Sequence, residues 1–153
     1  MTRGESDAWF VTGGAKWARV FHSTDRGQSW TVNETPVAGG AESAGAFSIA
    51  FRDAENGMIV GGDYKKPKEG GATAAITRDG GKTWTAVENA PPFRSCVAWA
   101  KDRWIAVGTS GSHSSRDGKA WKELDGENWN AASFTKAGTG WAAGPKGRIA
   151  RFE

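Results

Sequence analysis

One short segment holds the residues of this sequence that are best suited to bind another molecule. In order, they are Tyr64, Lys65, Lys66 and Lys68. Clustered cations suit the carboxylate or phosphate groups of a partner, because charge-assisted hydrogen bonds are stronger than neutral ones. The simpler alternative is a solvated loop, since lysines lie mostly on protein surfaces. The binding interpretation predicts an anion- or partner-docking patch that also draws on residues from elsewhere in the chain: Arg94, His113, Lys146 and Arg148.

Other kinds of site have little support. The only histidines, His22 and His113, have no neighbouring ligands in the sequence, so we expect no metal site. No glycine-rich phosphate loop opens a helix, which argues against nucleotide binding, and we expect no cofactor. The carboxylates Glu42, Asp63 and Glu88 would serve a glycosidase only as a close pair, and nothing in the sequence pairs them. No catalytic residue is therefore assigned.

The composition is that of one folded domain. The chain has 153 residues and is only 38% hydrophobic, but nine Trp and seven Phe supply large buried surfaces from few positions. Basic and acidic residues are interspersed around a net charge of +3, which predicts an ordinary solvated surface without specific nucleic-acid binding. No apolar run approaches the roughly 20 residues that span a bilayer, and no signal peptide is evident.

Three turns of one type organise the chain. Each reads Ser or Thr, any residue, Asp, a glycine-containing turn and then Trp. Asp accepts hydrogen bonds from nearby backbone N–H groups and Gly adopts a positive φ at little cost, so each turn can reverse a strand. The third copy is one residue shorter between Asp and Trp. The copies comprise Ser23, Asp25, Gly27 and Trp30; Thr77, Asp79, Gly81 and Trp84; and Ser115, Asp117, Gly118 and Trp121.

Glycine-ended apolar strands recur with the same order. They end at Gly13, Gly61, Gly108 and Gly144, a repeat of roughly 40 residues that is typical of a propeller blade. No segment shows helical periodicity, so the sequence predicts an all-β protein, a β-propeller of four-stranded antiparallel blades. The predicted blades cover residues 8–33, 46–87, 94–124 and 129–152 of a single domain, 1–153.

The predicted strand count is incomplete at both ends. The first unit lacks an opening strand and the last lacks a fourth, which leaves fourteen strands, or about three and a half blades. In a propeller, one end of the chain commonly completes the blade begun at the other. We therefore expect the C-terminal part of a larger propeller, with a strand-exchanged oligomer or a compact four-bladed form as alternatives. Loops at Asp63–Gly71 and Thr109–His113 are expected on the face opposite the Asp turns.

At its three Asp turns the chain resembles Asp-box (BNR) β-propeller proteins. The segments Trp-Ile-Ala-Val-Gly at 104–108 and Gly-Trp-Ala-Ala-Gly-Pro-Lys-Gly-Arg-Ile-Ala-Arg-Phe at 140–152 look most like the photosystem II stability/assembly factor-like group. This resemblance implies a non-catalytic propeller, periplasmic or secreted, that holds a partner protein. We accordingly expect a binding or assembly scaffold that docks a protein or an acidic polymer on the loop-rich face.

The alternative is a glycan-active or glycan-binding module. Sialidases and xyloglucanase-type enzymes resemble this chain in the same Asp-box repeat, so an enzyme of this kind would be a glycoside hydrolase. Sialidases, however, need an arginine cluster and a Tyr nucleophile paired with Glu. Tyr64 is the only tyrosine and lies among lysines. Trp17, Trp99 and Trp104 would stack on sugars if exposed, or else pack between blades.

Overall fold

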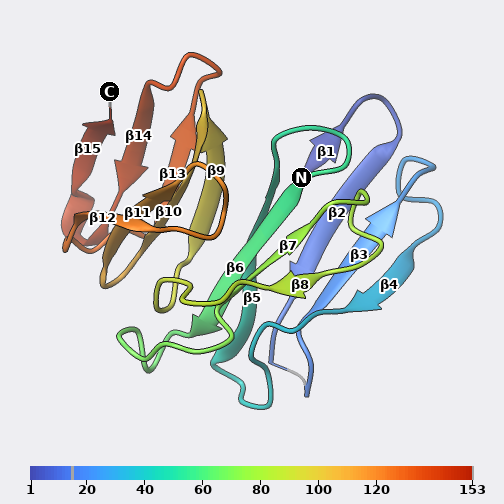
Figure 1. Ribbon diagram of the computed structural model, residues 1–153, viewed down its shortest axis with the longest axis horizontal. Helices are drawn as coiled ribbons and strands as arrows, with labels where there is room; N and C mark the ends of the chain where they lie inside the picture. The colour runs from blue at the N-terminus through green and yellow to red at the C-terminus, as the bar shows by residue number, and fades with distance from the viewer. Residues whose placement is uncertain (15, 153) are drawn as a thin grey trace.

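The computed structural model describes residues 1–14 and 16–152, and nearly all of its regular structure is antiparallel β-sheet (Figure 1). Four sheets follow one another along the chain. They contain β1 (Thr2–Arg3), β2 (Asp7–Thr12), β3 (Arg19–Ser23) and β4 (Thr31–Glu34); β5 (Ala44–Phe51), β6 (Gly57–Asp63), β7 (Ala74–Thr77) and β8 (Thr85–Ala86); β9 (Cys96–Ala100), β10 (Arg103–Gly108), β11 (Gly111–Ser115) and β12 (Lys122–Asp125); and β13 (Ala131–Phe134), β14 (Gly140–Ala143) and β15 (Ile149–Phe152).

The all-β prediction is confirmed. Within the described residues, the helical structure consists of one 3₁₀ turn, η1 (Pro145–Gly147). None of the described helical structure is long and apolar enough to cross a membrane.

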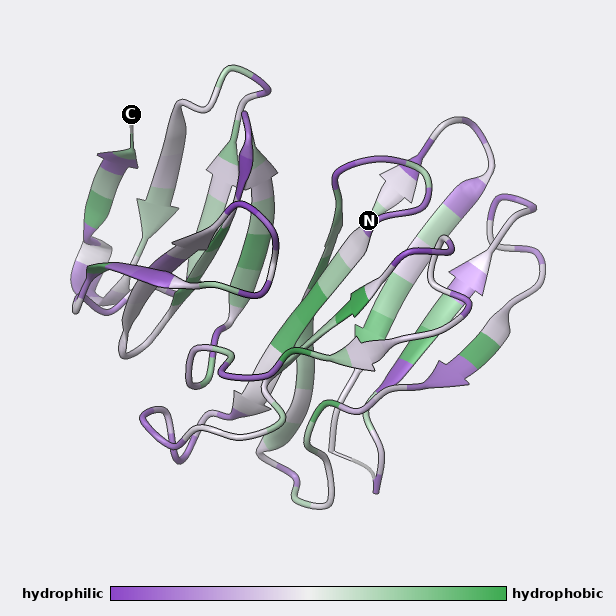
Figure 2. Ribbon diagram, viewed as in Figure 1, coloured by the Kyte–Doolittle hydropathy of each residue, from purple (hydrophilic) through white to green (hydrophobic). Residues whose placement is uncertain are grey.

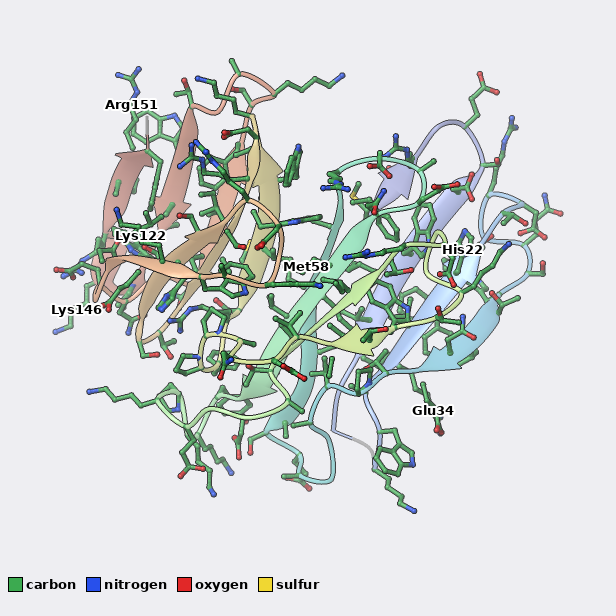
Figure 3. The ribbon with its side chains drawn as sticks, viewed as in Figure 1. His22, Glu34, Met58, Lys122, Lys146 and Arg151 are labelled. Atoms are coloured by element: carbon green, nitrogen blue, oxygen red, sulfur yellow. The ribbon has the colours of Figure 1, made fainter. Side chains whose placement is uncertain are left out.

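Each pair of consecutive sheets shares an apolar core. Trp9 of the first sheet packs in a cluster with Ile59 of the second. Met58, which alternates with Ile59 along β6, packs with Trp104 of the third sheet (Figure 3). Trp129 lies in the third cluster, between the third and fourth sheets. Figure 2 shows the hydrophobic residues along the strands and mostly hydrophilic residues in the connecting loops. The second and third sheets are therefore buried on both faces.

Two details of the predicted strand layout are wrong. The first sheet does have an opening strand, because Thr2–Arg3 pairs with β2 as β1, so the described chain has fifteen strands. This strand is only two residues long, and Gly13 beyond the end of β2 bridges directly to Gly45 of β5. The expected loop at Thr109–His113 is mostly strand. A tight turn follows Gly108, after which Gly111–Ser115 forms β11 and pairs with β10.

The glycines that end the second strands make room for the chain that enters a sheet. A Cβ atom on Gly61 would lie 1.9 Å from the carbonyl oxygen of Gly45, and one on Gly108 would lie 2.6 Å from that of Phe93. A Cβ atom on Gly144 would likewise lie 2.4 Å from the carbonyl oxygen of Asn128. The repeated glycine therefore serves close backbone approach, which a side chain would prevent.

The three Asp turns join the third and fourth strands of their sheets and share one hydrogen-bond pattern. In the first, Ser23 Oγ accepts from the backbone N–H of Gly27 at 2.8 Å, and Asp25 Oδ1 accepts from that of Ser29 at 2.8 Å. Trp30 folds back and donates from Nε1 to the carbonyl of Gly27 at 3.1 Å. The second turn repeats these bonds with Thr77, Asp79, Gly81, Thr83 and Trp84.

The shorter third turn keeps the Ser–Asp part of the pattern and loses the tryptophan bond. Asp117 Oδ1 accepts from the backbone N–H groups of Lys119 and Ala120, and Ser115 Oγ from that of Gly118. Trp121 Nε1 is buried without a hydrogen-bond partner in the described part of the chain. One residue fewer between Asp and Trp thus costs the tryptophan hydrogen bond, while the strand reversal survives.

Candidate functional site

The face opposite the Asp turns carries the connections between second and third strands and between sheets. We call it the loop face and define it by residues 64–73, 87–95 and 109–110. Contacts among these three segments, described below, join them into one surface. The Asp turns lie on the other face with the first-to-second turns: the backbone N–H of Arg26 donates to the carbonyl of Ser6 at 3.0 Å, and that of Gly80 to Glu55 at 2.9 Å.

The lysine-rich segment is exposed on the loop face, between β6 and β7. Tyr64, Lys65, Lys66 and Lys68 are all exposed. Asp63 caps the segment by accepting from the backbone N–H of Lys65 at 2.9 Å. The pKa of Asp63 lies below its usual value, first because of a hydrogen bond from the Ser43 side chain and then because of the Lys65 N–H. The carboxylate therefore holds the loop in shape and is not free for acid–base chemistry.

A chain of hydrogen bonds ties this loop to the next sheet. Ser110 Oγ donates to the carbonyl of Pro67 at 2.6 Å. Arg94 Nη1 donates to the same Ser110 Oγ at 3.2 Å and to the carbonyl of Phe93 at 2.7 Å. The loop of the second sheet is thus held by two residues that belong to the third.

Arg94 also contacts His113. Arg94 Nη2 lies 2.9 Å from His113 Nδ1. A guanidinium only donates, so Nδ1 is the acceptor and the ring proton resides on Nε2. Burial, and then the charge of Arg94, lower the pKa of His113 below its usual value of 6.5, with Glu123 and Asp125 acting in the opposite direction. The imidazole is therefore neutral at pH 7.

Arg94 is an internal cation. The residue is 1% exposed and its Nε has no hydrogen-bond partner among the described atoms. Burial lowers the pKa of Arg94 to about 10, against the opposing charges of Glu123 and Asp125. The group stays charged at neutral pH but does not face solvent. It connects to the lysine loop through Ser110, and the cations of that loop are the exposed ones.

One aromatic residue beside Tyr64, Phe47, was not identified from the sequence. Phe47 is 41% exposed and Tyr64 is 48% exposed, and their rings meet edge to face at 6.1 Å. Phe47 also meets the buried Phe93 edge to face at 5.1 Å. Phe47 lies where the register between β5 and β6 shifts. In the sequence it is one of many apolar residues in a strand, and only the irregular register leaves it at the surface.

The structure does not join Lys146 and Arg148 to this cluster by any contact of the described residues. Lys146 is exposed in η1 and has a left-handed backbone, with φ of 57° (Figure 3). Arg148 pairs with Glu127, and its guanidinium lies over the ring of Trp129 at 5.7 Å. Arg148 therefore belongs to the boundary between the third and fourth sheets, and Lys146 lies in the turn between β14 and β15 of the fourth sheet.

The aspartates of the Asp turns are turn-formers. The pKa values of Asp25, Asp79 and Asp117 are all lowered to about 2. The hydroxyl of Ser29 is the largest cause for Asp25, and the backbone N–H of Lys119 for Asp117. For Asp79, burial acts upward and is outweighed by several hydrogen bonds, the first from Thr83. Carboxylates held ionised by their own turn are poor general acids.

Other surfaces offer less chemistry. A groove of about 780 Å³ lies between the third and fourth sheets, lined by apolar residues such as Ile105 and Phe134 and by charged residues such as Lys101 and Arg103. Its carboxylate, Asp125, already accepts from Ser112 Oγ at 2.6 Å and from Trp129 Nε1 at 3.1 Å. Within the described residues, no three His, Cys, Asp or Glu side chains gather as a metal site would require.

Comparison with known proteins agrees with this architecture. No protein-family model and no curated protein matches the chain. Among solved structures, YCF48 bound to a D1 peptide superposes with a TM-score of 0.67 at 18% identity, over 97% of this chain and 48% of that one. The fold is that of a β-propeller.

Two further solved structures support the assignment. YCF48 from Cyanidioschyzon merolae has a TM-score of 0.61 at 14% identity. The match covers 97% of this chain and 54% of the YCF48 chain. An ancestral GH74 enzyme has a TM-score of 0.57 at 14% identity, over 95% of this chain and 25% of that one. This chain thus spans about half the length of the two YCF48 chains, and the predicted partial propeller is confirmed. Identities this low establish the fold alone.

Proposed function

We propose that this chain is a non-catalytic binding module that docks an acidic protein segment on its loop face. One observation carries the proposal: an exposed group of three lysines and two aromatic rings is held in place from below by the bonds of Ser110 and Arg94. A loop that only needed to be soluble would not require a buried cation to order it. The residues assigned to docking are Phe47, Tyr64, Lys65, Lys66 and Lys68, supported by Arg94, Ser110 and His113.

The composition of the patch indicates the chemistry of the partner. Lys65 and Lys68 offer ammonium groups to carboxylates, while Lys66 shares its charge with Glu69 at 3.2 Å. Phe47 and Tyr64 present ring surface beside them, as the anchors of protein interfaces commonly do. A peptide partner is supported by the neighbour YCF48, which was solved bound to a D1 peptide.

The test uses a fluorescein-labelled oligo-glutamate peptide and fluorescence anisotropy. Reversing Lys65 and Lys66 to Glu should weaken binding about tenfold, which corresponds to about 1.4 kcal/mol. The matched control reverses the exposed Lys82 and Lys119 of the Asp-turn face and should leave the affinity unchanged. Equal losses in the two double variants would show binding by overall charge and would reject a docking site on the loop face.

A glycan-active module is the second candidate, supported by the fold shared with the GH74 enzyme. Of the three tryptophans considered for stacking, Trp104 is buried and Trp99 is partly buried against it, whereas Trp17 is 45% exposed beneath Lys16 Nζ at 5.3 Å. Turnover of any member of a panel of chromogenic glycosides would favour this candidate and reject the non-catalytic one.

A further inference from the structure

The bonds that support the lysine loop, residues 64–68, pass through a group that can take up a proton near neutral pH. Ser110 Oγ donates to the carbonyl of Pro67 at 2.6 Å and accepts from Arg94 Nη1 at 3.2 Å. The other terminal nitrogen of the guanidinium, Nη2, lies 2.9 Å from His113 Nδ1. Among the residues in this chain of contacts, only the histidine changes its charge between pH 5 and 8.

The contact between Arg94 and His113 is a hydrogen bond in one protonation state only. A guanidinium has no acceptor, so Nδ1 is the lone-pair nitrogen of a neutral ring whose proton is on Nε2. The proton that charges the ring therefore goes to Nδ1. It replaces the acceptor by a donor and sets a second positive charge against the guanidinium. Because Arg94 is 1% exposed, solvent screens the two charges only weakly.

The charges around the ring do not remove this conflict. His113 pairs with Ala106 of β10 on one side and with Glu123 of β12 on the other. The charges of Glu123 and Asp125 favour protonation of the ring, but they also stabilise the guanidinium beside it. Burial, and then the charge of Arg94, outweigh the two carboxylates and hold the pKa of His113 below its usual value of 6.5.

We propose that protonation of His113 releases the lysine loop, so that the loop face docks its partner at neutral pH and weakens its hold in mildly acidic conditions. Once the ring is charged, the guanidinium is repelled and its bond to Ser110 is disturbed, which removes the support from the carbonyl of Pro67. The docking part rests on the function proposed above, whereas the release of the loop does not.

The pH range of the release follows from the direction of the shift. The ordered loop favours the neutral ring, so the support is complete above pH 6.5. It is lost as the pH falls below 6.5 and through the lower folded-state pKa of His113. One proton changes the balance between ordered and released loop by at most about tenfold between pH 7.5 and 5.5, when the released ring has its ordinary pKa.

Hydrogen exchange of two amides measures the release without any partner. Within the loop, the N–H of Lys66 donates to Asp63 and that of Glu69 to Lys66. Rates are divided by the intrinsic exchange rate at each pH, which removes the direct effect of pH on exchange. The protection of both amides should fall by about three- to tenfold from pH 7.5 to 5.5.

Two variants assign this loss to one histidine. In His113→Asn, Oδ1 lies about as far along the side chain as Nδ1, accepts from the guanidinium and does not titrate, so protection should become independent of pH. His22→Asn is the matched control, because His22 bonds to Asp7 at 3.0 Å in the first sheet, and it should keep the wild-type loss. If His113→Asn does not give the far-UV circular dichroism of the folded chain, His113→Gln replaces it.

Binding of the oligo-glutamate peptide is measured at the same two pH values, as a ratio of dissociation constants within each variant. Titration of the peptide is common to all variants, so the wild-type ratio should exceed that of His113→Asn by about three- to tenfold. Loss of protection in the wild type alone, with no peptide bound at either pH, would support the release and reject the docking function. Equal protection at both pH values, or the same loss in His113→Asn, would overturn the proposal.

Discussion

The two segments that lead into the third and fourth sheets make the same backbone hydrogen bonds but bury different side chains. The N–H of Arg94 donates to the carbonyl of Gly61 at 3.1 Å, and the N–H of Trp129 donates to that of Gly108 at 3.0 Å. The residues that follow also correspond: Ser95 N–H donates to Val107, and Asn130 N–H to Ala143. Arg94 is 1% exposed and Trp129 5% exposed. The same backbone hydrogen-bond arrangement therefore accepts either a charged or an aromatic buried side chain.

The difference shows which residue the fold needs. Trp129 fills the core between the third and fourth sheets and bonds Asp125 with its Nε1. Arg94 occupies the corresponding place at a cost in desolvation, which its lowered pKa of about 10 records. Its bonds go to Ser110 and His113 and not to an apolar cluster. We infer that Trp129 maintains the stack and that Arg94 maintains the shape of the loop face.

The largest expected effect comes from truncating the aromatic member of the pair. Trp129→Ala should lower the free energy of unfolding by about 3–5 kcal/mol, since it removes a buried aromatic ring and leaves a cavity between two sheets. Urea unfolding followed by tryptophan fluorescence measures this loss. A change below that of Arg94→Met would contradict the assignment of Trp129 to the stack.

The shared backbone frame is tested through its glycines. Gly61→Ala should destabilise the chain by about 1–3 kcal/mol, because the new Cβ would lie against the carbonyl oxygen of Gly45. Gly70→Ala is the control, since a Cβ there meets nothing within 4 Å. Thermal unfolding of the two variants should separate them, and equal melting temperatures would show that the close approach at Gly61 is unimportant.

Replacing the arginine should affect the loop more than the fold. Arg94→Met should change the free energy of unfolding by only about 1 kcal/mol, because an apolar side chain in place of a buried charge is often neutral. The loop should loosen, so the amides of Lys66 and Glu69, which bond within it, should exchange hydrogen faster. Oligo-glutamate binding should weaken as well. Unchanged exchange at these amides would show that Arg94 does not order the loop.

The smallest expected effect depends on pH. The folded-state pKa of His113 is lower than its ordinary value of 6.5, so the neutral ring contributes stability that is complete above pH 6.5. This contribution is lost as the pH falls below 6.5 and through the folded-state pKa. His113→Gln should therefore reduce the slope of stability between about pH 6.5 and 5. Ser110→Ala, which removes a neutral neighbour of Arg94, should keep the wild-type slope.

Much of the fold was predictable because its signals are local. The Asp turns depend on hydrogen bonds between residues two to four apart, such as Ser23 with Gly27, and each copy carries all of its own partners. The alternation of apolar residues along a strand and the glycine that ends it are also local signals, which lie within one repeat of the chain. The opening strand β1 was missed because two residues are too few to show alternation. The strand β11 was missed because Gly, Ser and His have low strand propensity, and its position depends on pairing with β10.

The sequence by itself determined the all-β class, the repeat and the three turns, and it marked the lysines at 65, 66 and 68. Only the tertiary structure decided that Arg94 is buried beneath them, that Phe47 is exposed beside them, and that Arg148 belongs to a different boundary. These outcomes depend on how one sheet is set against the next. Contacts such as Ser110 with Pro67 join residues far apart in the chain, and no local pattern specifies them.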